Sequence, residues 1–233
     1  MTGNGASLVQ QSVQAVRDHI RQNDLKVGDT LPGEGYFAEA LGVSRAVMRE
    51  AFGALAALRL IDVANGRRAR VGALDGSVIA ASLDHAVATS QVSIPEIWDV
   101  RRTLEVRTAA LAAEHRTDAE AAEIVALAEE MAGAGGDMDR VTACDVAFHA
   151  AIARASHNAL FVQIISSFAP IMQIAVPAAW HTRSTEEEKV QTIARHRRLA
   201  QAIADRDPQA AHLAMTTHFD RAIDALLRDP QAR

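Results

Sequence analysis

Four polar side chains with the chemistry of metal ligands fall on predicted inward faces of helices. Asp145 and His149 are four residues apart, so they are neighbours on one face of a helix predicted over 138–155. His196 and His218 each fall in phase with the apolar residues of their own predicted helices. A buried carboxylate and three buried imidazoles are unfavourable unless something pairs them. A divalent cation does so, because three nitrogens and one oxygen are an ordinary ligand set for zinc or a neighbouring transition metal.

Each of these residues has a simpler interpretation when it is taken alone. An Asp–His pair at this spacing also forms as a hydrogen bond on a helix surface, and a single inward histidine also occurs as a hydrogen-bonded core residue. A metal bound here has three candidate roles: it helps to bind a small ligand, it forms the centre of a metalloenzyme whose N-terminal part has a separate task, or it only stabilises the fold. The enzyme is disfavoured, because the chain has no His-Glu-x-x-His motif, no nucleophile elbow and no phosphate loop.

Arg101 is the candidate that would bind an anion near this cluster. It shares a predicted helix face with Trp98 and Glu105, which places it toward the bundle interior. A guanidinium and a metal ion together make a strong site for an organic acid. The alternative is an Arg101–Glu105 salt bridge on the helix surface. Trp180 is predicted to line the same cavity.

An all-α region must position these residues. Apolar periodicity after residue 76 predicts about seven helices and no strand, with breaks at Pro95, at the glycines of 133–136, at Pro177 and at Pro208. The predicted helices span residues 77–91, 94–115, 117–132, 138–155, 158–176, 186–205 and 208–228.

The first 72 residues predict a different unit. Helices are expected over residues 8–22, 34–41 and 44–60, followed by two β-prone pieces, 60–63 and 69–71, joined across Asn65-Gly66. Three helices and a hairpin make a winged helix-turn-helix. The whole chain is therefore expected to be mainly α, with a DNA-binding domain over 1–72, a linker over 73–76 and a helical domain over 77–233.

The third predicted helix has the features of a DNA-reading helix. Ser44 is a good N-cap and, with the amides of that helix start, suits a phosphate. Arg45 and Arg49 are one turn apart in its N-terminal half, where base edges in the major groove are within reach. Gly66 at the wing tip allows a close approach to the minor groove, with Arg67 beside it. The alternative is that these arginines only solvate a helix face.

Charge is distributed unevenly along the chain. The net charge of −5 alone argues against nucleic acid, but residues 1–74 hold nine Lys/Arg against seven Asp/Glu, and the remainder holds fifteen against twenty-two. A single cysteine, Cys144, excludes an internal disulfide. No segment resembles a signal peptide or a membrane span. We therefore expect a cytoplasmic protein that does not associate with a membrane.

The N-terminal pattern resembles the GntR family of regulators, whose heads run through a Leu-Pro-Ser-Glu-like turn, a Val-Ser-Arg helix start and an Arg-Glu-Ala continuation. One position departs from the family: many relatives carry a DNA-contacting arginine directly after that turn, where this chain has Gly35. We expect one DNA contact to be missing. The matching stretches, in order within residues 8–72, are Leu31-Pro32-Gly33-Glu34, Leu41-Gly42-Val43-Ser44-Arg45, Arg49-Glu50-Ala51 and Asn65-Gly66-Arg67-Arg68.

Residues 75–228 resemble the ligand-binding (FCD-type) domain of the FadR subgroup of that family. The resemblance implies that Asp145, His149, His196 and His218 bind one divalent metal ion, with zinc expected and nickel, cobalt or manganese as alternatives. It also implies that Arg101 grips the carboxylate of a small organic acid, and that a homodimer, acting as a repressor, binds an inverted-repeat operator in double-stranded DNA. The matching stretches are Val100 to Glu105 with Leu111-Ala112-Ala113, Asp145 to His149 with Ser156-His157-Asn158, Arg195-His196-Arg197 with Ala202-Ile203 and Asp207, and Met215 with His218.

Overall fold

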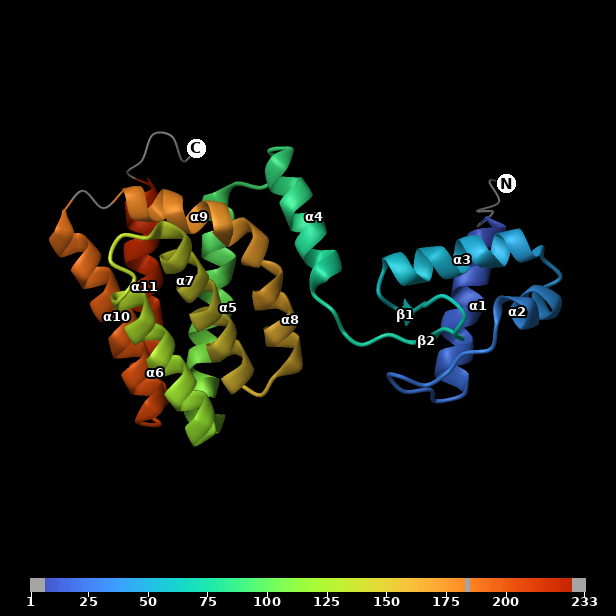
Figure 1. Ribbon diagram of the computed structural model, residues 1–233, viewed down its shortest axis with the longest axis horizontal. Coiled ribbons are helices and arrows are strands. Elements are labelled where there is room, and N and C mark those ends of the chain that lie inside the picture. Colours follow the sequence, from blue (N-terminus) through green and yellow to red (C-terminus); the bar gives the residue numbers. More distant parts are fainter. Residues whose placement is uncertain (1–6, 183–184, 228–233) are drawn as a thin grey trace, which may run out of the picture. The chain divides into compact units, whose positions relative to one another are not determined.

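The computed structural model describes residues 7–182 and 185–227, with side chains described as far as residue 223. The chain divides into two compact units, Met1–Val78 and Ile79–Arg233 (Figure 1). The first is a winged helix-turn-helix and the second is all-helical, so the predicted fold class is confirmed.

Three helices and a short hairpin form the N-terminal unit. The helices are α1 (Leu8–Gln22), α2 (Glu34–Leu41) and α3 (Arg45–Ala57). Gly42 ends α2 in the left-handed conformation, with φ of 65°, and so turns the chain toward α3. The core of this unit gathers apolar side chains from all three helices and the hairpin; its largest members are Val16, Leu31, Phe37, Met48, Phe52, Leu55 and Ile61.

Helix α3 is shorter than the sequence predicts, and its buried face is rotated. It ends at Ala57 instead of residue 60, and Leu58 is half exposed at 51%. Apolar periodicity predicts a buried face of Val47, Ala51, Leu55 and Leu58. Ala51 and Leu55 are buried as predicted, but Met48 and Phe52 take the places of Val47 and Leu58. The spacing of the buried residues is i, i+3, i+4 and i+7, which marks one face of an amphipathic helix.

The wing is an antiparallel pair of very short strands, β1 (Ile61–Asp62) and β2 (Arg70–Val71). The connection is longer than the two-residue hairpin that Asn-Gly predicts. Its tip is a turn closed by the amide of Arg67, which donates to the carbonyl of Ala64 at 3.1 Å. Only Gly66 of the two central residues has a positive φ, 71°, which fits a type II turn and not type I′.

Eight helices make up the rest of the described chain, one more than predicted. The extra helix arises because the expected helix 158–176 is two helices. These eight are α4 (Ser77–Ala88), α5 (Ile94–His115), α6 (Asp118–Ala132), α7 (Met138–Ala155), α8 (Ala159–Ser167), α9 (Ala169–His181), α10 (Glu186–Ala204) and α11 (Pro208–Leu227).

The break between α8 and α9 falls at Phe168, not at Pro177 as predicted. Pro170 lies in the first turn of α9, where it lacks an amide for the preceding turn and its ring excludes a continuous helix. The two axes differ by 57°. Pro177 instead lies inside α9, which continues to His181. Among the described residues no single helix meets the length and apolarity needed to cross a membrane, although α8 and α9 together do so as a bent pair.

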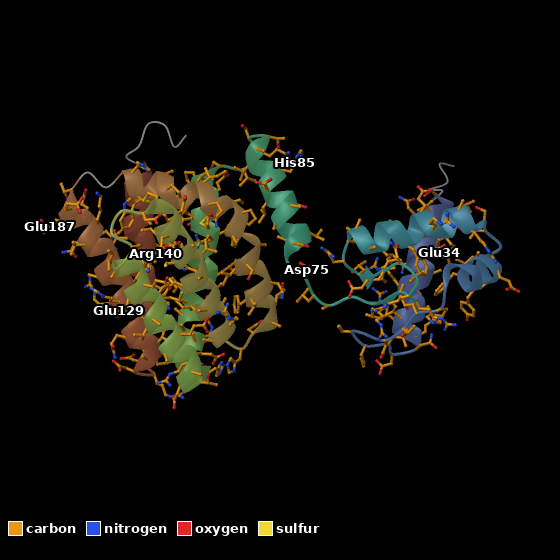
Figure 2. The ribbon with its side chains drawn as sticks, in the orientation of Figure 1. Glu34, Asp75, His85, Glu129, Arg140 and Glu187 are labelled. Atoms are coloured by element: carbon orange, nitrogen blue, oxygen red, sulfur yellow. The ribbon has the colours of Figure 1, made fainter. Side chains whose placement is uncertain are left out.

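Helix α5 is central to the second unit. It packs most extensively against α11 and also against α7 and α10 (Figure 1). Buried alanines such as Ala109, Ala112 and Ala113 allow these helices to approach closely. Charged residues cover the outside, among them Glu129 and Arg140, which Figure 2 labels. The result is a tightly packed interior in which any polar group must find a partner.

Candidate functional site

The residues predicted to read DNA lie on exposed parts of the N-terminal unit. The hydroxyl of Ser44 accepts a hydrogen bond from the amide of Val47 at 3.2 Å and so caps α3. Arg45 is the first residue of α3, and Arg49 follows one turn later. The side chain of Arg49 is 78% exposed, with Glu34 (labelled in Figure 2) at 3.7 Å. Such a loose surface pair leaves the guanidinium available.

The wing tip and Gly35 are the other parts of this surface that the sequence singled out. Gly66 and Arg67 are exposed at the tip of the wing. A Cβ atom added at Gly35 would meet only the Nη2 atom of Arg45, at 3.9 Å, which is ordinary contact. A side chain at this position is therefore compatible with the backbone, and the glycine is not required by packing.

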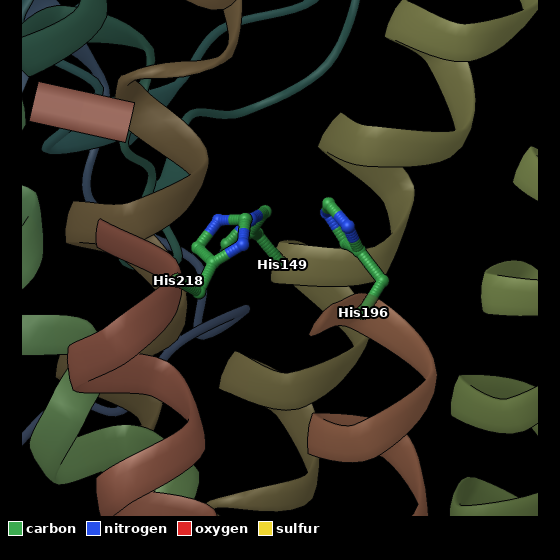
Figure 3. A group of neighbouring side chains, drawn as sticks. All are labelled: His149, His196 and His218. Atoms are coloured by element: carbon green, nitrogen blue, oxygen red, sulfur yellow. The ribbon is translucent and has the colours of Figure 1, made fainter. Parts of the chain in front are cut away.

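In the second unit the structure brings three of the predicted metal ligands together. His149 comes from α7, His196 from α10 and His218 from α11, and each is at most 5% exposed. One ring nitrogen from each lies within 4.8 Å of the others (Figure 3). Three helices far apart in the sequence thus place three imidazoles around one point, a cluster that can hold a metal ion.

Asp145, the fourth predicted ligand, lies beside this cluster. Its Oδ1 atom is 3.2 Å from Nε2 of His196 and 4.0 Å from Nε2 of His149. Burial by itself raises the pKa of this carboxyl group, but the hydrogen bond with His196 and the charges of His149 and His196 outweigh it. The net effect holds the pKa of Asp145 well below its usual value, so the group is a carboxylate.

Hydrogen bonds orient two of the imidazoles toward the cluster. Nδ1 of His196 lies 3.0 Å from the carbonyl oxygen of Thr192, and Nδ1 of His149 contacts the carboxylate of Glu105. Each of these acceptors requires that Nδ1 carry a proton. In the metal-free protein Nε2 of His196 faces Oδ1 of Asp145 at 3.2 Å and carries a proton for that contact. A metal ion would displace this proton, and both rings would then present an unprotonated Nε2, which is the form that binds a metal.

The polar atoms left over at this point fit a bound cation. Both ring nitrogens of His218 and the Oδ2 atom of Asp145 are buried and have no hydrogen-bond partner among the described residues. Burial is also the main cause that holds the pKa of His218 well below its usual value, so the ring is neutral. Buried groups of this kind are costly without a partner. Three imidazole nitrogens and a carboxylate would each gain one from a divalent ion such as zinc.

Trp180 and Arg101, the two residues predicted to bind the effector, line two different cavities beside the cluster. Trp180 lines a cavity of about 20 Å³ together with Asp145, His196 and His218, which is room for little more than one water molecule. Arg101 instead lines a neighbouring cavity of about 70 Å³, with His149. The expectation of one shared cavity is therefore wrong in this structure, because Trp180 and Arg101 line different cavities.

Arg101 is buried, as its position on α5 predicts, and it is also ion-paired. It is 2% exposed, and its Nε atom donates to Oε1 of Glu105 at 2.6 Å. Its guanidinium lies 5.3 Å from the ring centroid of Trp98 and 5.4 Å from that of Phe219. The sequence offered two interpretations of Arg101: an inward arginine, or a salt bridge with Glu105 on the helix surface. In the structure Arg101 points inward and also pairs with Glu105, because both side chains are buried.

Glu105 is a buried polar residue of this site to which the sequence assigned no role beyond a salt bridge with Arg101. It is 1% exposed and contacts both Arg101 and His149. Burial raises the pKa of this carboxyl, yet Arg101 and His149 together hold it below the usual value. Its position on the inward face of α5 was the available signal, but the contact with His149 arises only from the packing of α5 on α7.

A winged helix-turn-helix head and a helical domain with a buried polar site define a class of DNA-binding regulators. Family models agree: residues 8–71 match the model described as bacterial regulatory proteins, gntR family, and residues 96–221 match the FCD domain. The chain belongs to the GntR family and carries an FCD domain, which fits the FadR-like subgroup.

Individual relatives are regulators as well. The Glc operon transcriptional activator of Escherichia coli (strain K12) is 32% identical over 211 residues, covering 88% of this chain and 83% of that protein. The transcriptional regulator LutR of Bacillus subtilis (strain 168) is 29% identical over 212 residues, covering 89% and 95%. A solved structure, Streptococcus agalactiae GntR, shares the fold with a TM-score of 0.64 and 24% identity, covering 93% and 99%. The predicted transcriptional regulator is thereby confirmed over the metalloenzyme.

Proposed function

We propose that this protein is a repressor whose affinity for DNA is controlled by a small carboxylate, bound beside a zinc ion in the helical domain. The observation that carries the proposal is the convergence of His149, His196 and His218 with Asp145, where several buried polar atoms lack a protein partner. A divalent ion would give a partner to one ring nitrogen of His218 and to the carboxylate of Asp145. Nickel, cobalt or manganese would fit the same donors.

A sensory role for this site is supported by what lies next to it. Four protein ligands alone would complete a tetrahedral structural zinc. A buried arginine beside them serves no such purpose, but it does suit the carboxylate of a bound acid. Among the relatives, the galactonate operon transcriptional repressor of Escherichia coli (strain K12), 28% identical over 196 residues, is named for a carboxylic acid. We therefore assign the carboxylate of the effector to Arg101. Trp180, which lines the separate cavity beside the metal ligands, would contact the effector only where it reaches the metal.

DNA recognition in this proposal uses the exposed face of the head. Arg45 and Arg49 would contact base edges in the major groove, Ser44 a phosphate, and Gly66 with Arg67 the minor groove. A homodimer would place two heads on an inverted repeat. The effector then changes DNA affinity only to the extent that it binds the two conformations of the dimer differently.

The first test is the metal content of protein purified without chelator or nickel resin, with His196→Ala alongside the wild type. We expect about one divalent ion per chain in the wild type, and a large loss in the variant because one of the ligands is gone. His212→Ala is the matched control, since His212 lies on α11 but is exposed. Equal metal content in wild type and His196→Ala, or none in either, would contradict the proposed centre.

The second test separates a sensor from a structural metal. Metal-loaded protein is bound to a DNA fragment from its own promoter region, and small carboxylic acids are added one at a time. A sensor releases or tightens DNA with at least one acid, as linkage requires. Metal binding without any effect of acids on DNA affinity would reduce the metal to a structural role.

A further inference from the structure

The buried carboxylate of Glu105 uses both of its oxygens on groups of the metal site. Oε1 accepts a hydrogen bond from Nε of Arg101 at 2.6 Å, and Oε2 contacts Nδ1 of His149. With 1% of its surface exposed, the group has no access to solvent. A carboxyl group whose two oxygens both face donors is ionised, because a proton on either oxygen would displace one of them.

This contact decides which nitrogen of His149 faces the cluster. An acceptor at Nδ1 keeps the proton there and leaves the Nε2 lone pair for a metal. It also fixes the plane of the ring, as carboxylates that support metal-bound histidines do. Glu105 lies on α5 and His149 on α7, so the orientation of the ligand depends on a residue from a different helix.

The charges buried here can be counted. Among the described buried side chains, those that are ionised around the cluster are Arg101, Glu105 and Asp145. Histidines that bind a metal are neutral. The protein alone therefore contributes one net negative charge, and a divalent ion changes this to one net positive charge. Since an uncompensated buried charge is costly, the metal-loaded site is complementary to a single negative charge.

We propose that Glu105 is a positioning residue that orients His149 for the metal and, by neutralising Arg101, restricts the site to carboxylates with one negative charge. The inference rests on the proposed function and names the charge class of its effector. Without the metal ion the site has no net positive charge to attract an anion. The neighbouring cavity of about 70 Å³ is lined by Val146, Ile165 and Phe168 as well as Arg101, so the remainder of the acid is short and largely apolar.

Zinc affinity tests the positioning role. Metal-free wild type, Glu105→Gln and Glu105→Asp are titrated with zinc in competition with a chromogenic chelator, and the melting temperature of each metal-free protein is recorded. We expect Glu105→Gln to bind zinc about 10–100-fold more weakly and Glu105→Asp to recover part of the loss. Glu129→Gln, an exposed residue of α6 that pairs with Arg197, is the control and should match the wild type. Wild-type affinity in a folded Glu105→Gln would overturn the role.

Charge selectivity is tested with two acids of similar size, lactate with one negative charge and malonate with two. Thermal stabilisation is measured at saturating zinc. The wild type should be stabilised more by lactate than by malonate, and neither acid should stabilise the metal-free protein. Glu105→Gln removes one negative charge and should reverse the preference, whereas Arg101→Gln should lose the response to lactate. The charge assignment would be overturned if malonate stabilised the wild type as much as lactate does, or if neither acid stabilised it.

The two proposals fail differently. If the wild type binds no zinc, both the proposed function and this inference are contradicted. A wild type that binds zinc and responds to carboxylates, while Glu105→Gln keeps the same affinity and the same preference, leaves the proposed function intact and removes only the role of Glu105.

Discussion

Among single residues, His218 has the clearest need for a binding partner. Its two ring nitrogens are buried without a partner among the described residues, although the neighbouring His149 and His196 are each held by an acceptor at Nδ1. An unpartnered imidazole lowers the stability of the metal-free fold.

The low pKa of His218 predicts a pH dependence of stability in the metal-free protein. The unfolded chain binds a proton at this residue below about pH 6.5 while the folded chain does not. The free energy of unfolding therefore rises with pH in this range and falls on acidification, by at most about 1.4 kcal/mol per pH unit. Urea unfolding of the chelator-treated protein between about pH 7 and 5 measures it.

His218→Gln should flatten that slope, and the exposed His212→Gln should leave it unchanged. Asp145 and Glu105, whose pKa values are lowered from 3.8 and 4.5, act at more acidic pH and do not obscure the comparison. An identical slope in wild type and His218→Gln would show that this histidine is not the titrating group.

Arg45 carries the sharpest residue-level prediction for DNA. If Arg45 reads a guanine as we propose, replacement by alanine removes a bidentate contact and should weaken binding to the operator by about 1–3 kcal/mol and relax the preference at one base pair. Fluorescence anisotropy with operator and scrambled DNA measures both. Arg197→Gln, on the helical domain and paired with Glu129, should bind as the wild type does. Equal losses on both DNAs would reassign Arg45 to a phosphate contact.

Among the elements, the wing is held by a close approach of backbone to backbone. The amide of Gly72 donates to the carbonyl of Leu60 at 3.0 Å, where the chain after β2 passes the segment between α3 and β1. A Cβ atom at Gly72 would collide with the carbonyl oxygen of Arg59 and lie 3.1 Å from the carbonyl carbon of Leu60. Only glycine fits this crossing.

Gly72→Ala should therefore destabilise the head by about 1–3 kcal/mol, the usual cost of overpacking. Gly53→Ala is the matched control with the opposite sign. Gly53 lies in α3, and a Cβ atom added there would have nothing within 4 Å, so alanine should stabilise the helix by about 0.5–1 kcal/mol. Urea denaturation followed by circular dichroism compares them. A neutral Gly72→Ala would mean that the backbone relaxes at this crossing.

At the scale of the whole molecule, the two units differ in charge and in role. The mildly basic residues 1–74 suit a polyanion, whereas the remainder is acidic. A single head offers few contacts, so specificity in this class of regulator comes from pairing two of them. The dimer is part of our proposal for this protein.

An intact inverted repeat should accordingly bind far more tightly than one half-site. Inserting five base pairs rotates one half-site by about half a helical turn relative to the other and should abolish the higher affinity for the full repeat. An insertion of about ten base pairs restores the rotation and should recover part of that affinity. Band shifts on a footprinted promoter fragment, with the protein mass from sedimentation, provide the measurement. Equal affinity for one half-site and the full repeat would contradict a dimer bound across both.

Local sequence signals determined the elements of this protein. Helical periodicity and caps such as Ser44 placed most helices within a few residues, because these signals act between near neighbours in the chain. The same logic erred at Pro177, where a proline is tolerated inside α9, and missed the break that Pro170 creates. Periodicity also identified the inward histidines, since it reports which face of a helix is buried.

Tertiary structure decided what those buried faces meet. The sequence placed Arg101 and Glu105 on one face of α5, but it did not show that Glu105 also contacts His149 of α7. Nor did it show that Arg101 and Trp180 line different cavities. The physical reason is that spacing along a helix fixes a direction only, whereas the partner of a buried charge depends on how separate helices pack.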